Sequence, residues 1–170
     1  MSQNPITDIN ALLNEMSQQL HSYLSAGNID NPLMIGIHSG GVWIAEQLHH
    51  RLGLQEPLGT LDISFYRDDF SRIGINPEVK PSNLPFEVDD RCIILVDDVL
   101  QTGRTIRAAL NEIFDYGRPA RVILAVLLQR DGHELPIKAD ITGARIELAA
   151  DEQVKLTGPN NLSLNIYKQS

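Results

Sequence analysis

The chain has 170 residues, 42% of them hydrophobic and 21% charged, which suits one soluble globular domain spanning residues 1–170. No apolar run approaches the roughly 20 residues of a membrane-spanning helix, and MSQNPITDIN at the start lacks the features of a secretory signal. The one cysteine, Cys92, excludes an internal disulfide, so we expect a cytoplasmic protein. A formal net charge of −8 opposes nucleic-acid binding, which depends on Lys and Arg meeting phosphates.

The N-terminal part of the chain predicts a helix, a strand and a second helix. Thr7 or Asp8 can cap the first helix, which ends at Gly27. Its apolar residues have helical spacing: Ile9, Leu12, Leu13, Met16, Leu20, Tyr23 and Leu24. LMIGI (33–37) reads as a buried strand, HSGG (38–41) as a turn, and residues 42–52 as a helix that Gly53 stops.

The rest of the chain continues this alternation. Strands are predicted at 58–66, 93–96 and 122–128, and a helix at 105–116 precedes the last of these. Weaker strand patterns follow at 145–149 and 162–167. β-rich runs that alternate with amphipathic helices predict an α/β fold with a mostly parallel central sheet flanked by helices. In such sheets ligands bind beyond the carboxyl ends of the strands.

Residues 66–90 do not fit the alternation, because they contain three prolines and show no sustained periodicity. A loop of this length in a compact domain usually serves as a lid, a binding loop or a small hairpin. We expect a flexible cover here, although a tolerated surface insertion would have the same composition.

The stretch IILVDDVLQTGRT (93–105) carries the clearest chemical signal. A loop of Gly and hydroxyl residues that follows a buried strand and opens a helix aims backbone N–H groups at an anion, and the helix dipole adds positive charge. The two carboxylates beside it suit a ligand that also carries hydroxyls, or one accompanied by Mg²⁺. A ribose 5-phosphate meets both demands. The alternative is that Asp97 and Asp98 only cap a turn.

This stretch resembles the phosphoribosyl-diphosphate (PRPP) binding motif of the type I phosphoribosyltransferases. LDISFYRDDFS (61–71), residues 96–120 and ELPIKAD (134–140) narrow the resemblance to the PyrR family. The resemblance implies a uracil phosphoribosyltransferase that converts uracil and PRPP to UMP and pyrophosphate, with possible regulation of pyrimidine genes. It also implies Mg²⁺ as cofactor, a homodimer or higher homo-oligomer, and a small base-binding hood at 128–170.

The family pattern assigns roles to individual positions. It places the catalytic Asp97 and Asp98 at the ribose and at Mg²⁺. The 5-phosphate falls to Val99, Gln101, Thr102, Gly103, Arg104 and Thr105. The pyrophosphate falls to His38, Ser39, Gly40, Gly41 and Arg67, and the base to Leu128 and Arg130.

Two departures from the family pattern, at the pyrophosphate turn and at the base-side segment, leave alternatives open. In the base-side segment members typically show Gly-His-Arg ahead of the Glu, where this chain has Asp131-Gly132-His133. Many members carry Lys-Thr-Arg-Gly at the pyrophosphate turn, where this chain has His38-Ser39-Gly40-Gly41. A catalytically weak UMP- or PRPP-sensing regulator is therefore a second hypothesis, and a purine-base transferase of the same fold is a third. A receiver-like signalling domain also ends strands on acid pairs, but it lacks the TGRT loop. Between Arg130 and Glu152 three basic residues face six acidic ones, so RNA binding is doubtful.

Overall fold

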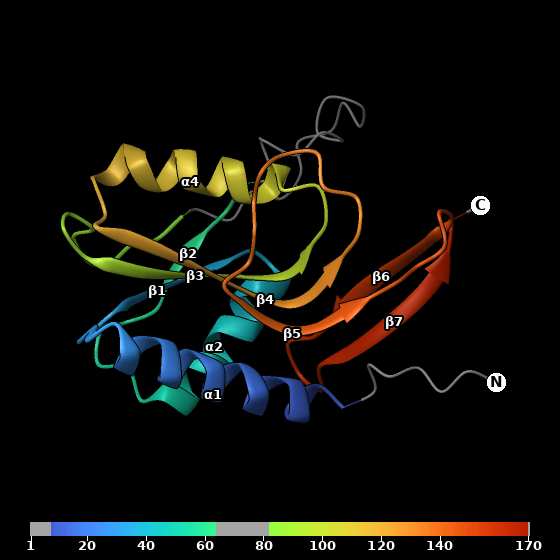
Figure 1. Cartoon of the computed structure of the whole chain (residues 1–170), viewed down its shortest axis with the longest axis horizontal. Helices are drawn as coiled ribbons and strands as arrows, with labels where there is room; N and C mark the ends of the chain where they lie inside the picture. Colours follow the sequence, from blue (N-terminus) through green and yellow to red (C-terminus); the bar gives the residue numbers. More distant parts are fainter. Residues whose placement is uncertain (1–7, 64–81, 170) are drawn as a thin grey trace.

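A parallel sheet forms the centre of the molecule (Figure 1). The computed structural model describes residues 8–63 and 82–169. The sheet has five strands in the order β2-β1-β3-β4-β5, and every neighbouring pair is parallel. Their bounds are β1 Leu33–Ile37, β2 Gly59–Leu61, β3 Cys92–Leu100, β4 Arg121–Arg130 and β5 Ile141–Ile146. The predicted α/β class with a mostly parallel sheet is confirmed.

Helices cover both faces of this sheet (Figure 1). Helices α1 (Ile9–Ala26) and α2 (Gly40–Leu52) lie on one face and α4 (Arg104–Tyr116) on the other. The predicted cap of the first helix is Asp8, whose side chain accepts a hydrogen bond from the Ala11 N–H at 3.0 Å. Gly53 ends α2 in the left-handed conformation that glycine adopts without cost.

Each face of the sheet has its own apolar core. One core joins α1 and α2 to the sheet through residues such as Met16 and Leu48, and the other joins α4 through residues such as Ile113. Because both faces are covered, the central strands are buried along nearly their whole length, as all five residues of β1 show. This explains why these strands read as unbroken apolar runs.

The C-terminal part differs from the sequence prediction. The strand expected at 145–149 is β5, which lies earlier, at Ile141–Ile146, and forms an edge of the main sheet. Strand β6 (Glu152–Thr157) was not predicted, and it pairs antiparallel with β7 (Ser163–Lys168) in a separate hairpin. Within the described part of the predicted hood, this hairpin and the loop 131–140 lie outside the main sheet. Leu156 of the hairpin is buried against the core of α1 and α2.

The second predicted strand and the segment after it are described only in part. Strand β2 is shorter than the predicted 58–66, and residues 64–81 lie outside the described part. Most of the expected cover at 66–90 therefore also lies outside it. Residues 82–90 lie mostly at the protein surface, but Val88 packs into the core, where it is 2% exposed. In the described ranges no helix is long and apolar enough to cross a membrane.

Candidate active site

The site begins where strand β1 ends beside the acid pair of β3. The two strands are parallel neighbours, so the turn after β1 and the acid pair of β3 meet at the same edge of the sheet. A Cβ added to Gly41 would lie 2.7 Å from the Val96 carbonyl oxygen, and one added to Gly40 would lie 2.8 Å from Asp98 Cγ. The turn therefore rests directly on β3, at a distance that only glycine permits.

The acid pair lies within β3, because the strand continues to Leu100 instead of ending at Asp97. Asp97 is 5% exposed, and its Oδ1 accepts the Asp98 N–H at 2.8 Å. Asp98 is half-buried, and its Oδ1 accepts the Val99 N–H at 2.8 Å. These bonds fix the carboxylates before any ligand binds. They leave Asp98 in the wall of a cavity.

The loop 101–105 turns the chain from β3 into α4, as the motif predicted. Gly103 has a φ of +93° and immediately precedes the first residue of the helix. The Thr102 hydroxyl oxygen accepts the Arg104 N–H at 3.1 Å, which shapes the turn. The amino end of α4 thus faces the cavity with the hydroxyls of Thr102 and Thr105 beside it, and this arrangement favours a phosphate.

A second segment, residues 133–135, supports this loop through hydrogen bonds. The Glu134 and Leu135 N–H groups both donate to the Thr102 carbonyl oxygen, at 3.0 and 3.1 Å. The His133 ring nitrogen Nδ1 lies 3.1 Å from the Gln101 carbonyl oxygen. Arg104 Nε donates to Glu134 Oε1 at 3.0 Å, so this side chain is engaged with the support. The ELPI sequence (134–137) belongs to the predicted base-binding hood, and in the structure it contacts the loop 101–105.

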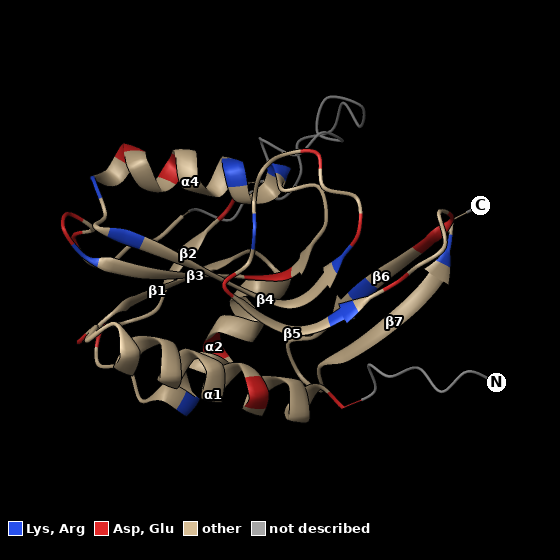
Figure 2. Ribbon diagram, in the orientation of Figure 1, with Lys and Arg blue, Asp and Glu red and all other residues tan. Residues whose placement is uncertain are grey.

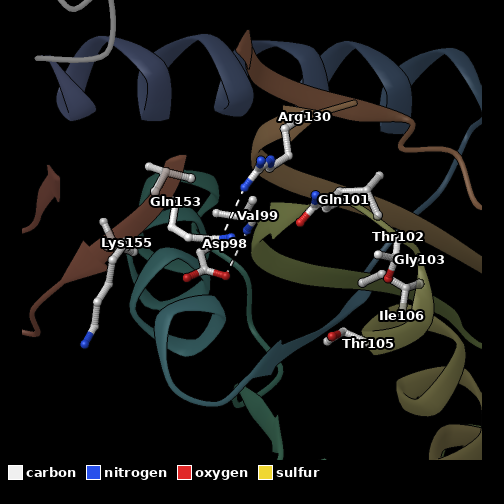
Figure 3. Close-up of a pocket in the computed structure, with 13 residues that line it drawn as sticks. Asp98, Val99, Gln101, Thr102, Gly103, Thr105, Ile106, Arg130, Gln153 and Lys155 are labelled. Atoms are coloured by element: carbon white, nitrogen blue, oxygen red, sulfur yellow. Dashed lines mark hydrogen bonds between the residues drawn. The ribbon is translucent and has the colours of Figure 1, made fainter. Parts of the chain in front are cut away.

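The cavity has a volume of about 310 Å³ and combines the sheet with the C-terminal hairpin (Figure 3). Its lining comes from the end of β3, the loop 101–105, Arg130 of β4, and residues 153–156 of β6. Arg130 is 8% exposed and donates to the Glu152 carbonyl oxygen at 3.3 Å and to Gln153 Oε1 at 3.5 Å. These bonds attach the hairpin to the sheet beside the cavity.

The structure brings most of the predicted residues together. Asp98, Val99, Gln101, Thr102, Gly103, Thr105 and Arg130 line the cavity, and Asp97 and the turn 38–41 adjoin it. Leu128 differs, because it is fully buried in the core and does not line the cavity. The Arg104 side chain does not line it either, and Arg67 lies outside the described residues.

Sequence reasoning missed the contribution of β6. The signal was present, because Val154 and Leu156 alternate with Gln153, Lys155 and Thr157 at strand period, ahead of the turn residues Gly158 and Pro159. The alternation is short and weakly apolar, and for that reason it was not assigned.

The side chains available as metal ligands at this site are few, and this decides which kind of metal site it can form. Within the described ranges, no group of three or more His, Cys, Asp or Glu side chains is gathered as a metal site. The two carboxylates of the acid pair are the hard oxygen ligands at hand. Mg²⁺ characteristically binds one or two carboxylates and completes its coordination with substrate phosphates and water. The site therefore fits a Mg²⁺ ion that arrives with a phosphorylated substrate.

Strand order, anion loop and acid pair together define a type I phosphoribosyltransferase fold, and comparison with known proteins agrees. The family model of the phosphoribosyl transferase domain matches residues 2–160, so the chain belongs to that family. A purine phosphoribosyltransferase from Pyrococcus horikoshii has a TM-score of 0.61 and 24% identity, covering 81% of this chain and 82% of that one. The Trypanosoma cruzi hypoxanthine phosphoribosyl transferase has a TM-score of 0.64 and 21% identity, covering 83% and 75%.

Curated relatives narrow the assignment to one branch. The bifunctional protein PyrR of Nitrosococcus oceani is 57% identical over 161 residues, which cover 94% of this chain and 91% of that protein. The bifunctional protein PyrR of Pseudomonas aeruginosa is 56% identical over 153 residues, 90% of each chain. The chain belongs to the PyrR family. The predicted resemblance and the predicted class of enzyme, a phosphoribosyltransferase of pyrimidine metabolism and its regulation, are confirmed at the level of the family.

Proposed function

We propose that this protein transfers the phosphoribosyl group of PRPP to uracil and releases UMP and pyrophosphate, in the cytoplasm and as a homo-oligomer. One observation carries the proposal: the anion loop 101–105 and the carboxylate of Asp98 line the same 310 Å³ cavity. A ribose 5-phosphate has its phosphate at one end and its hydroxyls at the other, so it can engage both groups at once. The substrate and the homo-oligomeric state follow from the family pattern.

The chain's own residues hold the sugar in place for the reaction. The backbone N–H groups and hydroxyls at Thr102–Thr105 bind the 5-phosphate, and Asp97 and Asp98 accept hydrogen bonds from the ribose hydroxyls. The bond from C1 to pyrophosphate breaks while the uracil nitrogen bonds to C1, which carries positive charge in the transition state, and the proton of that nitrogen ends on the released pyrophosphate. Fixed carboxylates near the ribose favour that charge, and a firmly held sugar keeps base and C1 in line.

Mg²⁺, when it binds with PRPP, would be held by the carboxylates of Asp97 and Asp98 and would neutralise charge on the leaving pyrophosphate. The base falls to the hairpin side of the cavity. There the Arg130 guanidinium and the Gln153 amide offer N–H donors that suit the carbonyl oxygens of uracil.

The test uses purified protein, Mg²⁺ and PRPP with uracil or hypoxanthine, and follows pyrophosphate release. Uracil-dependent release supports the proposal. Release that depends on hypoxanthine would replace it with a purine-base transferase. Because the turn 38–41 has no Lys or Arg, a nucleotide-sensing regulator is the second candidate. Tight UMP binding without turnover of either base would favour that regulator.

We propose that any gene regulation by this protein does not rest on a basic RNA-binding surface in the C-terminal part. Figure 2 shows acidic and basic positions interspersed from the end of β4 to β6, with no basic stretch. An RNA backbone would meet more carboxylates than cations there. A mobility-shift titration with a pyrimidine-operon leader tests this, and submicromolar, UMP-dependent binding would refute it.

A further inference from the structure

The pyrophosphate side of the site lacks a fixed cation in the expected place. The turn His38-Ser39-Gly40-Gly41 contains neither Lys nor Arg. It also lies directly against an acidic neighbour, because a Cβ on Gly40 would meet the Asp98 carboxylate. A diphosphate group binds most strongly where charged donors reach its oxygens. The amino end of α2 supplies only the partial charge of a helix dipole.

Two cationic side chains line the cavity in the described part of the chain, and they differ in their freedom. Arg130 is buried and donates to Gln153 and to the Glu152 carbonyl, so it is committed to the hairpin. Lys155 is exposed, and no carboxylate in the described ranges lies within ion-pair distance of its ammonium group. Among the described residues that line the cavity, Lys155 is therefore the cation whose charged group is held neither by the hairpin backbone and side chains nor by a carboxylate.

Strand β6 carries Lys155 toward the turn. Gln153 and Lys155 lie on the same face of the strand, because side chains alternate, and Gln153 is bound to Arg130 at the end of β4. Further along, Gly158 packs on Trp43 in the first turn of α2, where a Cβ on the glycine would lie 3.0 Å from the indole ring. The strand thus runs from the end of β4 to the start of α2, and Lys155 lies between these points.

The close-up agrees with this placement. In Figure 3 Lys155 lies on the opposite side of Asp98 from Thr102 and Thr105. A sugar phosphate whose 5-phosphate occupies the loop 101–105 and whose ribose meets Asp98 would direct its C1 substituent to that side.

We propose that Lys155 is a diphosphate-binding residue of this enzyme, which supplies from the hairpin the cation that the turn 38–41 lacks. Its ammonium group binds the diphosphate oxygens of PRPP and of released pyrophosphate. It does not bind the 5-phosphate or the base. The inference rests on the proposed function for the orientation of the sugar phosphate, but it concerns only the diphosphate end.

The test compares Lys155→Gln with the matched control Lys168→Gln, which removes the same charge from the other strand of the hairpin, outside the cavity lining. Calorimetric titrations with Mg²⁺ measure the Kd of PRPP, of pyrophosphate and of UMP. Because hydrogen bonds between an ammonium group and phosphate oxygens are stronger than bonds between neutral groups, Lys155→Gln should weaken the binding of PRPP and of pyrophosphate by about 10-fold or more. UMP, which has no diphosphate, should keep its Kd within about 2-fold in both variants, and Lys155→Arg should restore part of the PRPP affinity.

Three results would overturn the inference: unchanged PRPP affinity in Lys155→Gln, an equal loss for UMP, or an equal loss in Lys168→Gln. Binding is measured without a base, so the outcome does not depend on uracil transfer. If the wild type binds PRPP but does not transfer its phosphoribosyl group to uracil, the proposed reaction fails. A loss of PRPP and pyrophosphate affinity in Lys155→Gln, without a loss of UMP affinity, would still support the diphosphate role.

Discussion

Replacing Gly103 by alanine tests whether the backbone of the phosphate loop is held in the geometry that binding requires. Gly103 has a φ of +93°, where a side chain costs about 1–2 kcal/mol. The added Cβ would also lie 3.0 Å from Ile137 Cγ1 and 3.1 Å from its Cβ, closer than ordinary packing allows. Overpacking of this kind costs about 1–3 kcal/mol. We expect Gly103→Ala to lower the free energy of unfolding by about 2–5 kcal/mol.

Gly53 offers a matched control, since it also has a positive φ, of +62°, but a Cβ there would meet nothing within 4 Å. Gly53→Ala isolates the conformational cost, about 1 kcal/mol, at a helix end far from the loop. Urea denaturation followed by circular dichroism gives both free energies of unfolding. Calorimetry gives the Kd of UMP, which should rise about 10-fold or more in Gly103→Ala, because that change corresponds to only 1.4 kcal/mol, and stay unchanged in Gly53→Ala.

The reasoning would be refuted if both variants lost the same stability and both bound UMP as the wild type does. That result would mean that Ile137 and the loop yield to the methyl group without displacing the phosphate donors.

Further predictions concern the acid pair, the turn and the cysteine. Asp98→Asn keeps an oxygen that accepts the Val99 N–H, so we expect an unchanged unfolding midpoint but turnover lowered by about 100-fold or more; normal rates would contradict the ribose role. Gly41→Ala brings a Cβ within 2.7 Å of the Val96 carbonyl oxygen, and urea unfolding should show a loss of about 1–3 kcal/mol or more. Burial raises the pKa of the Cys92 thiol, and the nearby Arg121 guanidinium only partly opposes this. The folded state therefore keeps the thiol protonated at a pH where the unfolded chain loses the proton, so this group's contribution to stability falls as pH rises through the unfolded pKa. Iodoacetamide should modify folded protein more slowly than protein in urea, and equal rates would count against burial of the thiol.

The main sheet was predictable because strands that are buried on both faces need apolar residues at nearly every position, and such runs are visible in the sequence. LMIGI and the run at 122–128 have no other role than core strands, and both were assigned correctly. The residues at which the strands end were harder to predict. Strand β3 runs on through Asp97 and Asp98, because the parallel neighbour β4 still pairs with it at Val99 and Leu100. Tertiary pairing of this kind leaves no local signal.

The candidate site was predictable where it is contiguous in sequence. Asp98 and the loop 101–105 come from one stretch, and that stretch carries its own chemistry. The turn 38–41 could be placed beside them once the parallel order of β1 and β3 was assumed. The lining from Gln153 and Lys155 could not, because it depends on a hairpin that folds back across the end of β4.

The wall of the cavity is built from two separate structural elements, and substitutions can change one without the other. The wall that carries Asp98 belongs to the parallel sheet, where a methyl group at Gly41 would collide with the backbone of β3. The opposite wall belongs to the small antiparallel ribbon β6–β7, whose lining residue Lys155 is also exposed. Substitutions on the ribbon should retune which leaving group or base is accepted while the scaffold stays intact.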